Sequence, residues 1–289
     1  MAIAIRKLAP ALGAEVSGVT LSRPMERQVI SLLKSAYREH GILLLRNQIL
    51  DDASLVRFAR HFGELQTFRQ PGREKNVPPE IFRTANTDIH GTLVTPESET
   101  AKMLRINWLW HIDSCYRKIP AKGVVMYATD ISGDGGETVF ANAAAAYDDL
   151  SANMKGRIAN LQACHSFAFL VENHDLPPLS EEEAGHMPKA VHPLVRQHGD
   201  GRRSLFLSPP YMEPIQGLSQ SDSTSLVEEL IEWVTQERYT YRHQWHRHDV
   251  IIWDNSWTMH RVMPFEITHR KRVMRGAAIL GTEPVRSII

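Results

Sequence analysis

The chain has 289 residues, of which 43% are hydrophobic and 23% charged, and its 33 basic and 33 acidic side chains give a formal net charge of zero. This balance argues against a nucleic-acid or membrane partner, because both kinds of partner favour a basic surface. No uncharged apolar run approaches the roughly 20 residues that a membrane helix needs. Two cysteines, Cys115 and Cys164, are too few for a disulfide framework, so we expect a cytoplasmic protein.

The first third of the chain predicts two helices and one long loop. Apolar residues at helical spacing follow Ser22, a candidate N-cap, as far as Gly41, and the letters ILLL at 42–45 then indicate a buried strand. A second helix is predicted over 51–65. Residues 66–105 are rich in Pro, Asn and Thr and predict either a disordered segment or a functional lid, with one short strand at 80–84.

Strands dominate the prediction for the remainder. They are expected at 123–129, at 137–142, in a hairpin within 190–208 around the turn HGDG, and in several pieces after residue 239. Helices are expected at 143–150, 151–163 and 220–239, with a loop at 171–190. The pattern predicts one domain, 1–289, that is mainly β with helical decoration: a β-sandwich or jelly roll.

The stretch WLWHIDSCY, residues 108–116, places His111 and Asp113 two residues apart in what reads as a buried strand. Residues i and i+2 of a strand share a face, so both side chains are available to one metal ion. His260, after the apolar strand DVIIWDN, is the candidate third ligand. Two histidines and one carboxylate are the donor set of non-haem Fe(II) oxygenases. Zinc bound by the same residues, or a purely structural His–Asp pair, remains an alternative.

Other histidines are assigned more ordinary roles. His243, His246 and His248 cluster in YRHQWHRHDV, and we assign them to a hydrated surface or loop. An Fe(II) site with three protein ligands still needs a co-substrate. A 2-oxo acid can chelate the metal, and its distal carboxylate calls for a guanidinium. Arg272 lies on an apolar strand twelve residues after His260 and is the candidate. The alternative is that it pairs with a structural carboxylate or extends its charged end outward to solvent.

Five ordered blocks carry a family resemblance. LGAEVSGVTL, ILLLRNQ with VRFARHFGEL, NWLWHIDSCY, SGDGGETVFANAAAAYDDL and YRHQWHRHDVIIWDNSWTMHR resemble the taurine dioxygenase and 2,4-dichlorophenoxyacetate dioxygenase family of Fe(II)- and 2-oxoglutarate-dependent oxygenases. The likeness runs from about residue 10 to residue 283 and implies a double-stranded β-helix core. It also implies site residues: iron on His111, Asp113 and His260, and the distal 2-oxoglutarate carboxylate on Thr138 and Arg272.

The same resemblance bears on the substrate side of the site. Asn107 matches an asparagine at that side of the pocket. The position of the family's second arginine, which contacts the substrate's anionic group, is Gly276 here, and the adjacent Arg275 is the candidate replacement. A shift of one residue places a strand side chain on the opposite face unless a bulge intervenes. Four aromatic residues are candidate pocket walls, with core packing as the alternative: Phe68, Phe82, Tyr116 and Tyr211.

The expected activity follows from this resemblance. With Fe(II), 2-oxoglutarate as co-substrate and O2, the protein is expected to hydroxylate an unactivated C–H bond of a small organic substrate and to release succinate and CO2. Cleavage of an ether, amine or sulfonate is one outcome of such a hydroxylation. The alternative is a cupin-like metal-dependent hydrolase or isomerase that consumes no oxygen. We expect a small-molecule substrate, no nucleic-acid or membrane partner, and a homo-oligomer.

Overall fold

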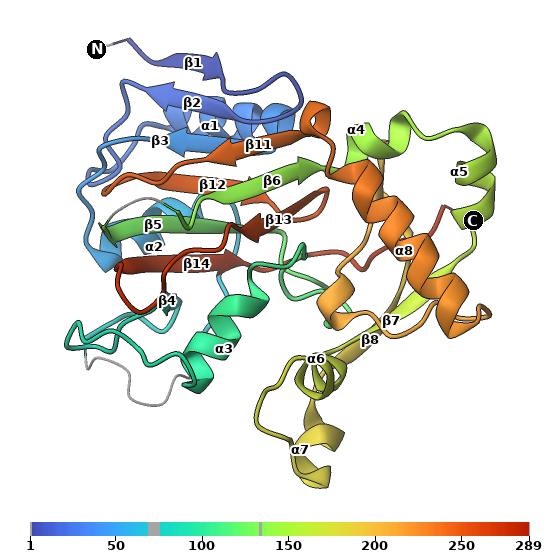
Figure 1. The fold of residues 1–289 in the computed structure, drawn as a ribbon. Coiled ribbons are helices and arrows are strands. Elements are labelled where there is room, and N and C mark those ends of the chain that lie inside the picture. The colour runs from blue at the N-terminus through green and yellow to red at the C-terminus, as the bar shows by residue number, and fades with distance from the viewer. Residues whose placement is uncertain (1, 69–75, 133–134, 289) are drawn as a thin grey trace.

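The computed structural model describes residues 2–68, 76–132 and 135–288. Its largest sheet has seven strands, and all neighbouring pairs are antiparallel except β2 and β3. Figure 1 shows this sheet beside the helical part of the molecule. In spatial order, the strands are β1 (Ala4–Lys7), β2 (Ala14–Ser17), β3 (Ile42–Leu45), β12 (Val250–Asp254), β5 (Gly123–Ile131), β14 (Arg272–Ile279) and β4 (Ile81–Ala85).

A smaller sheet packs against one face of the large sheet. Its three antiparallel strands are β11 (Thr240–His243), β6 (Thr138–Asn142) and β13 (Thr258–Val262), with β6 in the centre. Phe140 of β6 meets Trp253 of β12 with ring centroids 5.6 Å apart, within a buried apolar cluster drawn from both sheets. We call the face of the large sheet that points to this cluster its inner face.

Two amphipathic helices, α1 (Arg27–His40) and α2 (Asp52–Arg60), cover the outer face of the large sheet. Asp51 caps α2 by accepting a hydrogen bond from the Ser54 amide. The predicted start of the first helix at Ser22 is wrong: α1 begins at Arg27, and Glu26 precedes it in an extended conformation without a side-chain cap. Residues 22–26, which include Pro24, lie outside the helix.

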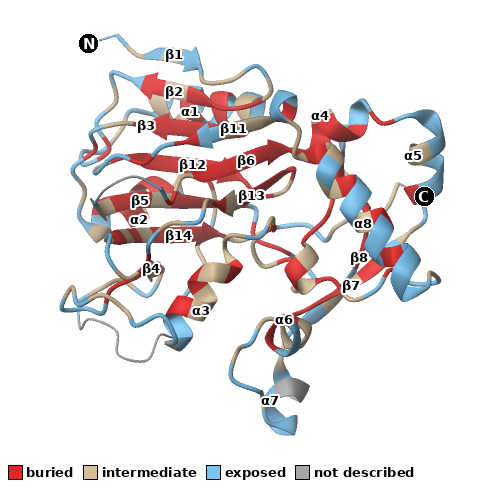
Figure 2. Cartoon of the chain, in the orientation of Figure 1, coloured by how far each residue is buried: buried red, intermediate tan, exposed pale blue. Residues whose placement is uncertain are grey.

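A further buried apolar cluster lies beside the sheets and includes Tyr147, Leu205 and Leu226. Figure 2 shows α8 (Gln220–Val234) buried on one side and exposed on the other. The predicted hairpin is confirmed as β9 (Val195–Gln197) and β10 (Arg203–Leu205). The other elements are α4 (Ala143–Asp148), α5 (Ala152–Ile158), β7 (Gln162–Ser166), α6 (Phe167–Asn173), α7 (Glu181–His186), β8 (Lys189–Pro193), η1 (Pro209–Tyr211) and η2 (Glu237–Tyr239).

The predicted class, mainly β with helices around it, is confirmed, but four further local predictions are wrong. The expected loop 66–105 contains helix α3 (Glu99–Ile106) in addition to β4, and the expected loop 171–190 contains α7. The expected helix 151–163 ends at Ile158, because Gln162 already pairs with Pro193 in β7 and β8. Stretch 108–116 is a series of turns, and a single bridge at His111 is its one strand-like feature.

Two further features are the state of the cysteines and the character of the helices. Cys115 and Cys164 are both free thiols in the structure. Of the helices in the described residues, none combines the length and the apolar character that crossing a bilayer requires.

Candidate metal centre

The predicted ligands His111, Asp113 and His260 lie together between the two sheets. His260 lies on β13, and the turns after α3 bring His111 beside it. Their backbones exchange two hydrogen bonds, with N···O distances of 2.9 and 3.0 Å, and their ring centroids are 4.3 Å apart. The reason given from the sequence, a shared strand face for His111 and Asp113, is therefore wrong, although the two side chains do converge.

The donor atoms of these three residues fit one ion. Asp113 Oδ1 lies 3.8 Å from His111 Nε2, and Asp113 Oδ2 lies 3.5 Å from His260 Nε2. Two donors on one ion, each with a bond of about 2.1 Å, can be up to about 4.2 Å apart. Among the described residues, this is the one group of three or more metal-ligating side chains whose donor atoms lie within 4.8 Å of one another.

Neighbouring groups fix the ligand orientation. His111 Nδ1 lies 2.7 Å from the Leu109 carbonyl oxygen, which can only accept, so Nδ1 carries the proton and Nε2 presents a lone pair to the site. Asn255, fully buried, holds the Asp113 backbone in both directions: its Oδ1 accepts from the Asp113 amide, and its Nδ2 donates to the Asp113 carbonyl, each at 2.9 Å. Sequence analysis missed Asn255, because a contact across 142 residues leaves no local pattern.

Burial sets the protonation of the ligands. Loss of hydration lowers the pKa of His260 well below its usual 6.5, with the adjacent His111 lowering it further, so the ring is neutral. Loss of hydration also raises the pKa of the Asp113 carboxyl, and His111 opposes that rise. His260 Nδ1 is buried without a hydrogen-bond partner in the described structure. A cation between these groups would offset the cost of burying the carboxylate charge.

Arg272, at the start of β14, is a second polar group near the ligand cluster. It is 8% exposed, and burial lowers its pKa from 12.5 to about 10, with no carboxylate in the described structure offsetting the effect. Its Nε donates to the Gly136 carbonyl at 3.0 Å. Gly136 has a φ of +71°, and a Cβ there would lie 2.9 Å from Arg272 Cδ, so this close approach requires glycine. The alternative that Arg272 pairs with a structural carboxylate does not agree with this geometry.

Thr138 lies next to Arg272 with its hydroxyl already oriented. Thr138 Oγ1 accepts from the indole N–H of Trp245 at 2.9 Å and from Arg272 at 3.4 Å. A hydroxyl has two lone pairs and one proton, so the Thr138 O–H remains available to donate. Two donors that point toward one place, one of them cationic, form an anion-binding site.

One cavity of about 90 Å³ joins the metal-ligating cluster to this anion-binding pair. All three ligands line it, together with Asn107, Thr138 and Arg272. Asn107 is the C-cap residue of α3, and its carbonyl accepts from the Val262 amide at 2.6 Å. The structure thus brings six of the seven predicted site residues to one cavity.

Arg275, the seventh, does not reach this cavity. Its side chain is on the outer face of the large sheet, where its NH1 lies 2.5 Å from Asp52 Oδ2 in the first turn of α2. The register shift between β14 and β5 occurs at Val273 and Met274, but the extra residue is Thr129 on β5. Alternation along β14 is therefore unbroken, and Arg275 faces away from Arg272.

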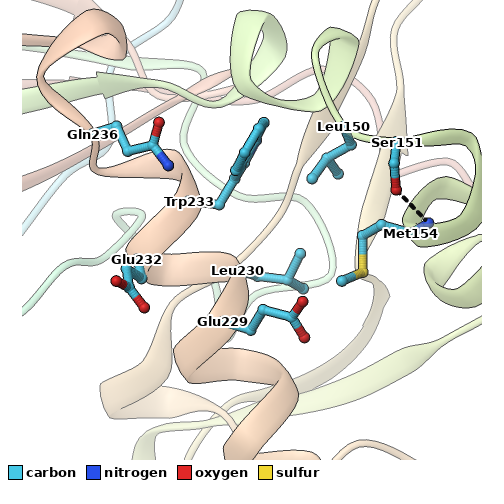
Figure 3. Close-up of a pocket in the computed structure, with 8 residues that line it drawn as sticks. All are labelled: Leu150, Ser151, Met154, Glu229, Leu230, Glu232, Trp233 and Gln236. Carbon is cyan, nitrogen blue, oxygen red and sulfur yellow. Dashed lines mark hydrogen bonds between the residues drawn. The ribbon is translucent and has the colours of Figure 1, made fainter.

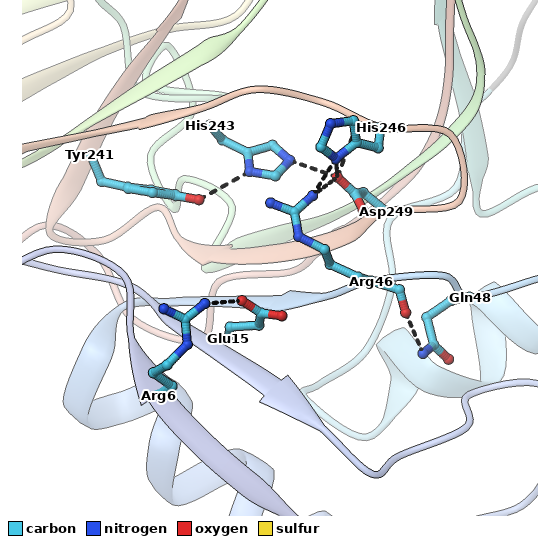
Figure 4. A network of polar contacts seen from close by, with 8 residues as sticks. All are labelled: Arg6, Glu15, Arg46, Gln48, Tyr241, His243, His246 and Asp249. Carbon is cyan, nitrogen blue, oxygen red and sulfur yellow. Dashed lines mark hydrogen bonds and ion pairs between the residues drawn. The ribbon is translucent and has the colours of Figure 1, made fainter.

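The histidine cluster of the sequence separates into different roles (Figure 4). His246 is exposed, as expected, but His243 is fully buried, so its assignment to a hydrated surface or loop is wrong. His243 Nε2 lies 3.1 Å from Asp249 Oδ2, which also accepts from Arg46 at 2.8 Å. The His243 ring packs edge-on to Trp245, with centroids 4.6 Å apart. This network supports the indole that donates to Thr138.

A second hollow, of about 300 Å³, lies between α5 and α8 (Figure 3). Two glutamates, Glu229 and Glu232, line this hollow, and its described lining includes no histidine or cysteine. Glu229 already pairs with Arg157 at 3.2 Å. This hollow therefore lacks the donor set that the cavity between the sheets provides.

Comparisons with known proteins agree with this geometry. The chain is 28% identical over 288 residues to the alpha-ketoglutarate-dependent 2,4-dichlorophenoxyacetate dioxygenase of Cupriavidus pinatubonensis, covering 96% of this chain and 98% of that protein. It is 31% identical to the (S)-phenoxypropionate/alpha-ketoglutarate-dioxygenase of Sphingobium herbicidovorans, covering 96% and 94%. The crystal structure of AAD-2 in complex with Mn(II) and N-oxalylglycine superposes with a TM-score of 0.89 at 32% identity, covering 99% and 100%.

The family assignment rests on nearly the whole chain. The family model described as "Taurine catabolism dioxygenase TauD, TfdA family" matches residues 4–278. The predicted reaction class is thereby confirmed over the cupin-like hydrolase or isomerase, and the cofactors of that class are Fe(II), 2-oxoglutarate and O2. The protein belongs to the TauD/TfdA family of dioxygenases.

Proposed function

We propose that this protein is an Fe(II)- and 2-oxoglutarate-dependent dioxygenase that hydroxylates an unactivated C–H bond of a small organic molecule and releases succinate and CO2. One observation carries the proposal: a single cavity is lined both by a His-Asp-His ligand set and by a buried arginine that has no carboxylate partner among the described residues. A molecule with one metal-chelating end and one anionic end can bind a metal held by the ligand set and the arginine at the same time.

Each residue has a role in this proposal. His111, Asp113 and His260 hold the iron, and 2-oxoglutarate directs its distal carboxylate to Arg272 and the Thr138 hydroxyl. When bound, the iron supplies the oxidising chemistry that couples decarboxylation of 2-oxoglutarate by O2 to oxygen insertion into the C–H bond.

The chain contributes position and exclusion of water. Hydrogen bonds at Nδ1 of His111 and along the backbone of Asp113 hold those two ligands still. Trp245 and Trp253 line the cavity and help to exclude solvent from it. We place Asn107, a neutral donor and acceptor, on the substrate side of the cavity.

The substrates named for relatives suggest a bond-cleaving outcome. Two similar proteins are named for phenoxy acids, and another, of Pseudomonas putida, is an alpha-ketoglutarate-dependent sulfate ester dioxygenase. Hydroxylation of a carbon that bears an ether or ester oxygen gives a product that collapses by losing that oxygen substituent. We propose the same consequence here when the hydroxylated carbon bears an ether, amine or sulfonate.

Four broader proposals accompany this function. We propose that 1–289 is a single domain with a double-stranded β-helix core, which the facing sheets of seven and three strands support. A cytoplasmic location is supported by the two free cysteines. A homo-oligomer remains a prediction, and light scattering of the purified protein tests it.

The proposal is tested by measuring Fe(II) binding and succinate formation in the wild type and in variants of the ligands. Anaerobically purified protein is expected to bind Fe(II) and to form succinate slowly from 2-oxoglutarate without a primary substrate. His111→Ala and Asp113→Ala should abolish both properties, whereas His269→Ala, on an exposed side chain, should change neither. Full succinate formation by either ligand variant would refute the proposed site. Zinc in the purified protein with no oxygen consumption would favour the hydrolase alternative.

A further inference from the structure

Position 276 carries glycine where the family has its second arginine, and the aromatic ring of Phe82 lies against this glycine. On the inner face of the large sheet, Gly276 pairs with Phe82 of β4 and with Met126 of β5. The Phe82 ring lies over the glycine: a Cβ at position 276 would be 2.5 Å from Phe82 Cζ and 2.9 Å from Cε1. Only glycine fits while Phe82 keeps this position.

Phe82 is itself supported and lines the cavity. Its ring packs against Phe68 with centroids 5.1 Å apart. Phe82, Met126 and Val262 give the cavity an apolar wall. Because these side chains offer no hydrogen-bond donors, an anionic group placed against them would lose its hydration without compensation.

No spare cation is available in the described lining of the cavity. Arg272 is the one lysine or arginine there, and the 2-oxoglutarate carboxylate occupies it in the proposed function. Arg275 is held on the outer face by Asp52. It would have to cross the plane of the sheet to reach the cavity, which the unbroken alternation of β14 prevents.

We infer that the primary substrate is uncharged where it meets β4 and β14, and that an aryl or alkyl group of the substrate packs on Phe82 over Gly276. Asn107, which lines the same cavity, then supplies a neutral polar contact. This inference rests on the proposed function and deepens it, because it separates this chain from enzymes that hold a substrate carboxylate or sulfonate with a second arginine.

A matched ligand pair tests the inference. Phenoxyacetamide and phenoxyacetate have nearly the same shape and differ in charge. Their binding to protein loaded with Mn(II) and N-oxalylglycine can be measured by calorimetry, without any turnover. We expect the amide to bind at least tenfold more tightly than the acid. Phe82→Arg places a cation on the apolar wall and should improve acid binding by about 10- to 100-fold, whereas Phe82→Leu should not.

A second arginine variant tests the same inference from β14, and binding of N-oxalylglycine separates failure of the inference from failure of the proposed function. Gly276→Arg combined with Phe82→Ala brings the cation from β14 and should improve acid binding similarly. Arg275→Gln should leave the ratio of acid to amide affinity unchanged. Wild-type protein that binds the acid as tightly as the amide, or failure of both arginine variants to gain acid binding while still binding N-oxalylglycine, overturns the inference. Failure to bind N-oxalylglycine, or to form succinate from 2-oxoglutarate alone, counts against the proposed function instead.

Discussion

Replacing Arg272 by methionine should weaken 2-oxoglutarate binding without destabilising the metal-free protein. One pKa unit corresponds to about 1.4 kcal/mol, so the lowering of the Arg272 pKa from 12.5 to about 10 corresponds to a burial cost of about 3 kcal/mol. Methionine fills similar space without that cost, and loss of the hydrogen bond to Gly136 offsets about 1 kcal/mol of the gain. The free energy of unfolding should therefore stay unchanged or rise.

Affinity should change in the opposite direction. Removing one partner of a buried charged pair costs about 2–5 kcal/mol, which corresponds to a rise in the 2-oxoglutarate dissociation constant of about 30-fold or more. Calorimetry with Mn(II)-loaded protein under nitrogen measures this constant, and urea unfolding of metal-free protein measures stability. Arg275→Met is the matched control, because its ion pair with Asp52 lies on the outer face. An unchanged affinity together with a large loss of stability would show that Arg272 is a structural residue.

Three further perturbations address the surroundings of the site. Asn255→Ala removes the bonds that hold the Asp113 backbone and should weaken Mn(II) binding by about 10- to 100-fold in a metal titration. Trp245→Phe removes the donor to Thr138 and should raise the Michaelis constant for 2-oxoglutarate by about 2- to 10-fold. His165→Leu should flatten the acid side of the stability profile, because burial lowers the pKa of this ring from 6.5 to about 3.

The sign of the pH effect follows from which state binds the proton. Between pH 6.5 and 3, the unfolded chain is protonated at His165 and the folded chain is not, so falling pH destabilises the fold. From pH 6.5 to pH 5 the wild type should lose about 1.5 kcal/mol more than His165→Leu in urea unfolding. Equal losses would contradict the assignment. Trp233→Phe is the control for Trp245→Phe, because the Trp233 indole donates to the Ala146 carbonyl and does not line the cavity.

Sequence reasoning named three residues whose donor atoms the structure brings together, but it misjudged how the fold assembles them. The His-x-Asp spacing was interpreted as a strand, whereas turns carry His111 and Asp113, and pairing of His111 with His260 across 149 positions brings them to the site. His243 was assigned to a hydrated surface or loop because it clusters with His246 and His248 near a turn, and its buried partner, Asp249, lies on the far side of that turn. Asn255 was missed for a similar reason. Such contacts depend on the sheet register, which no local pattern encodes.

The register of β14 determines which chemistry each of its side chains can perform. Arg272 and Gly276 fall on the inner face, while Arg275 falls on the outer face against α2. The extra residue at the irregularity lies in β5, at Thr129, so β14 keeps its alternation from end to end. Had the extra residue been in β14, Arg275 would have turned toward the cavity, and an anionic substrate would have found a cation there. The position of one bulge thus separates a cavity whose described lining has one arginine from a cavity that would have two.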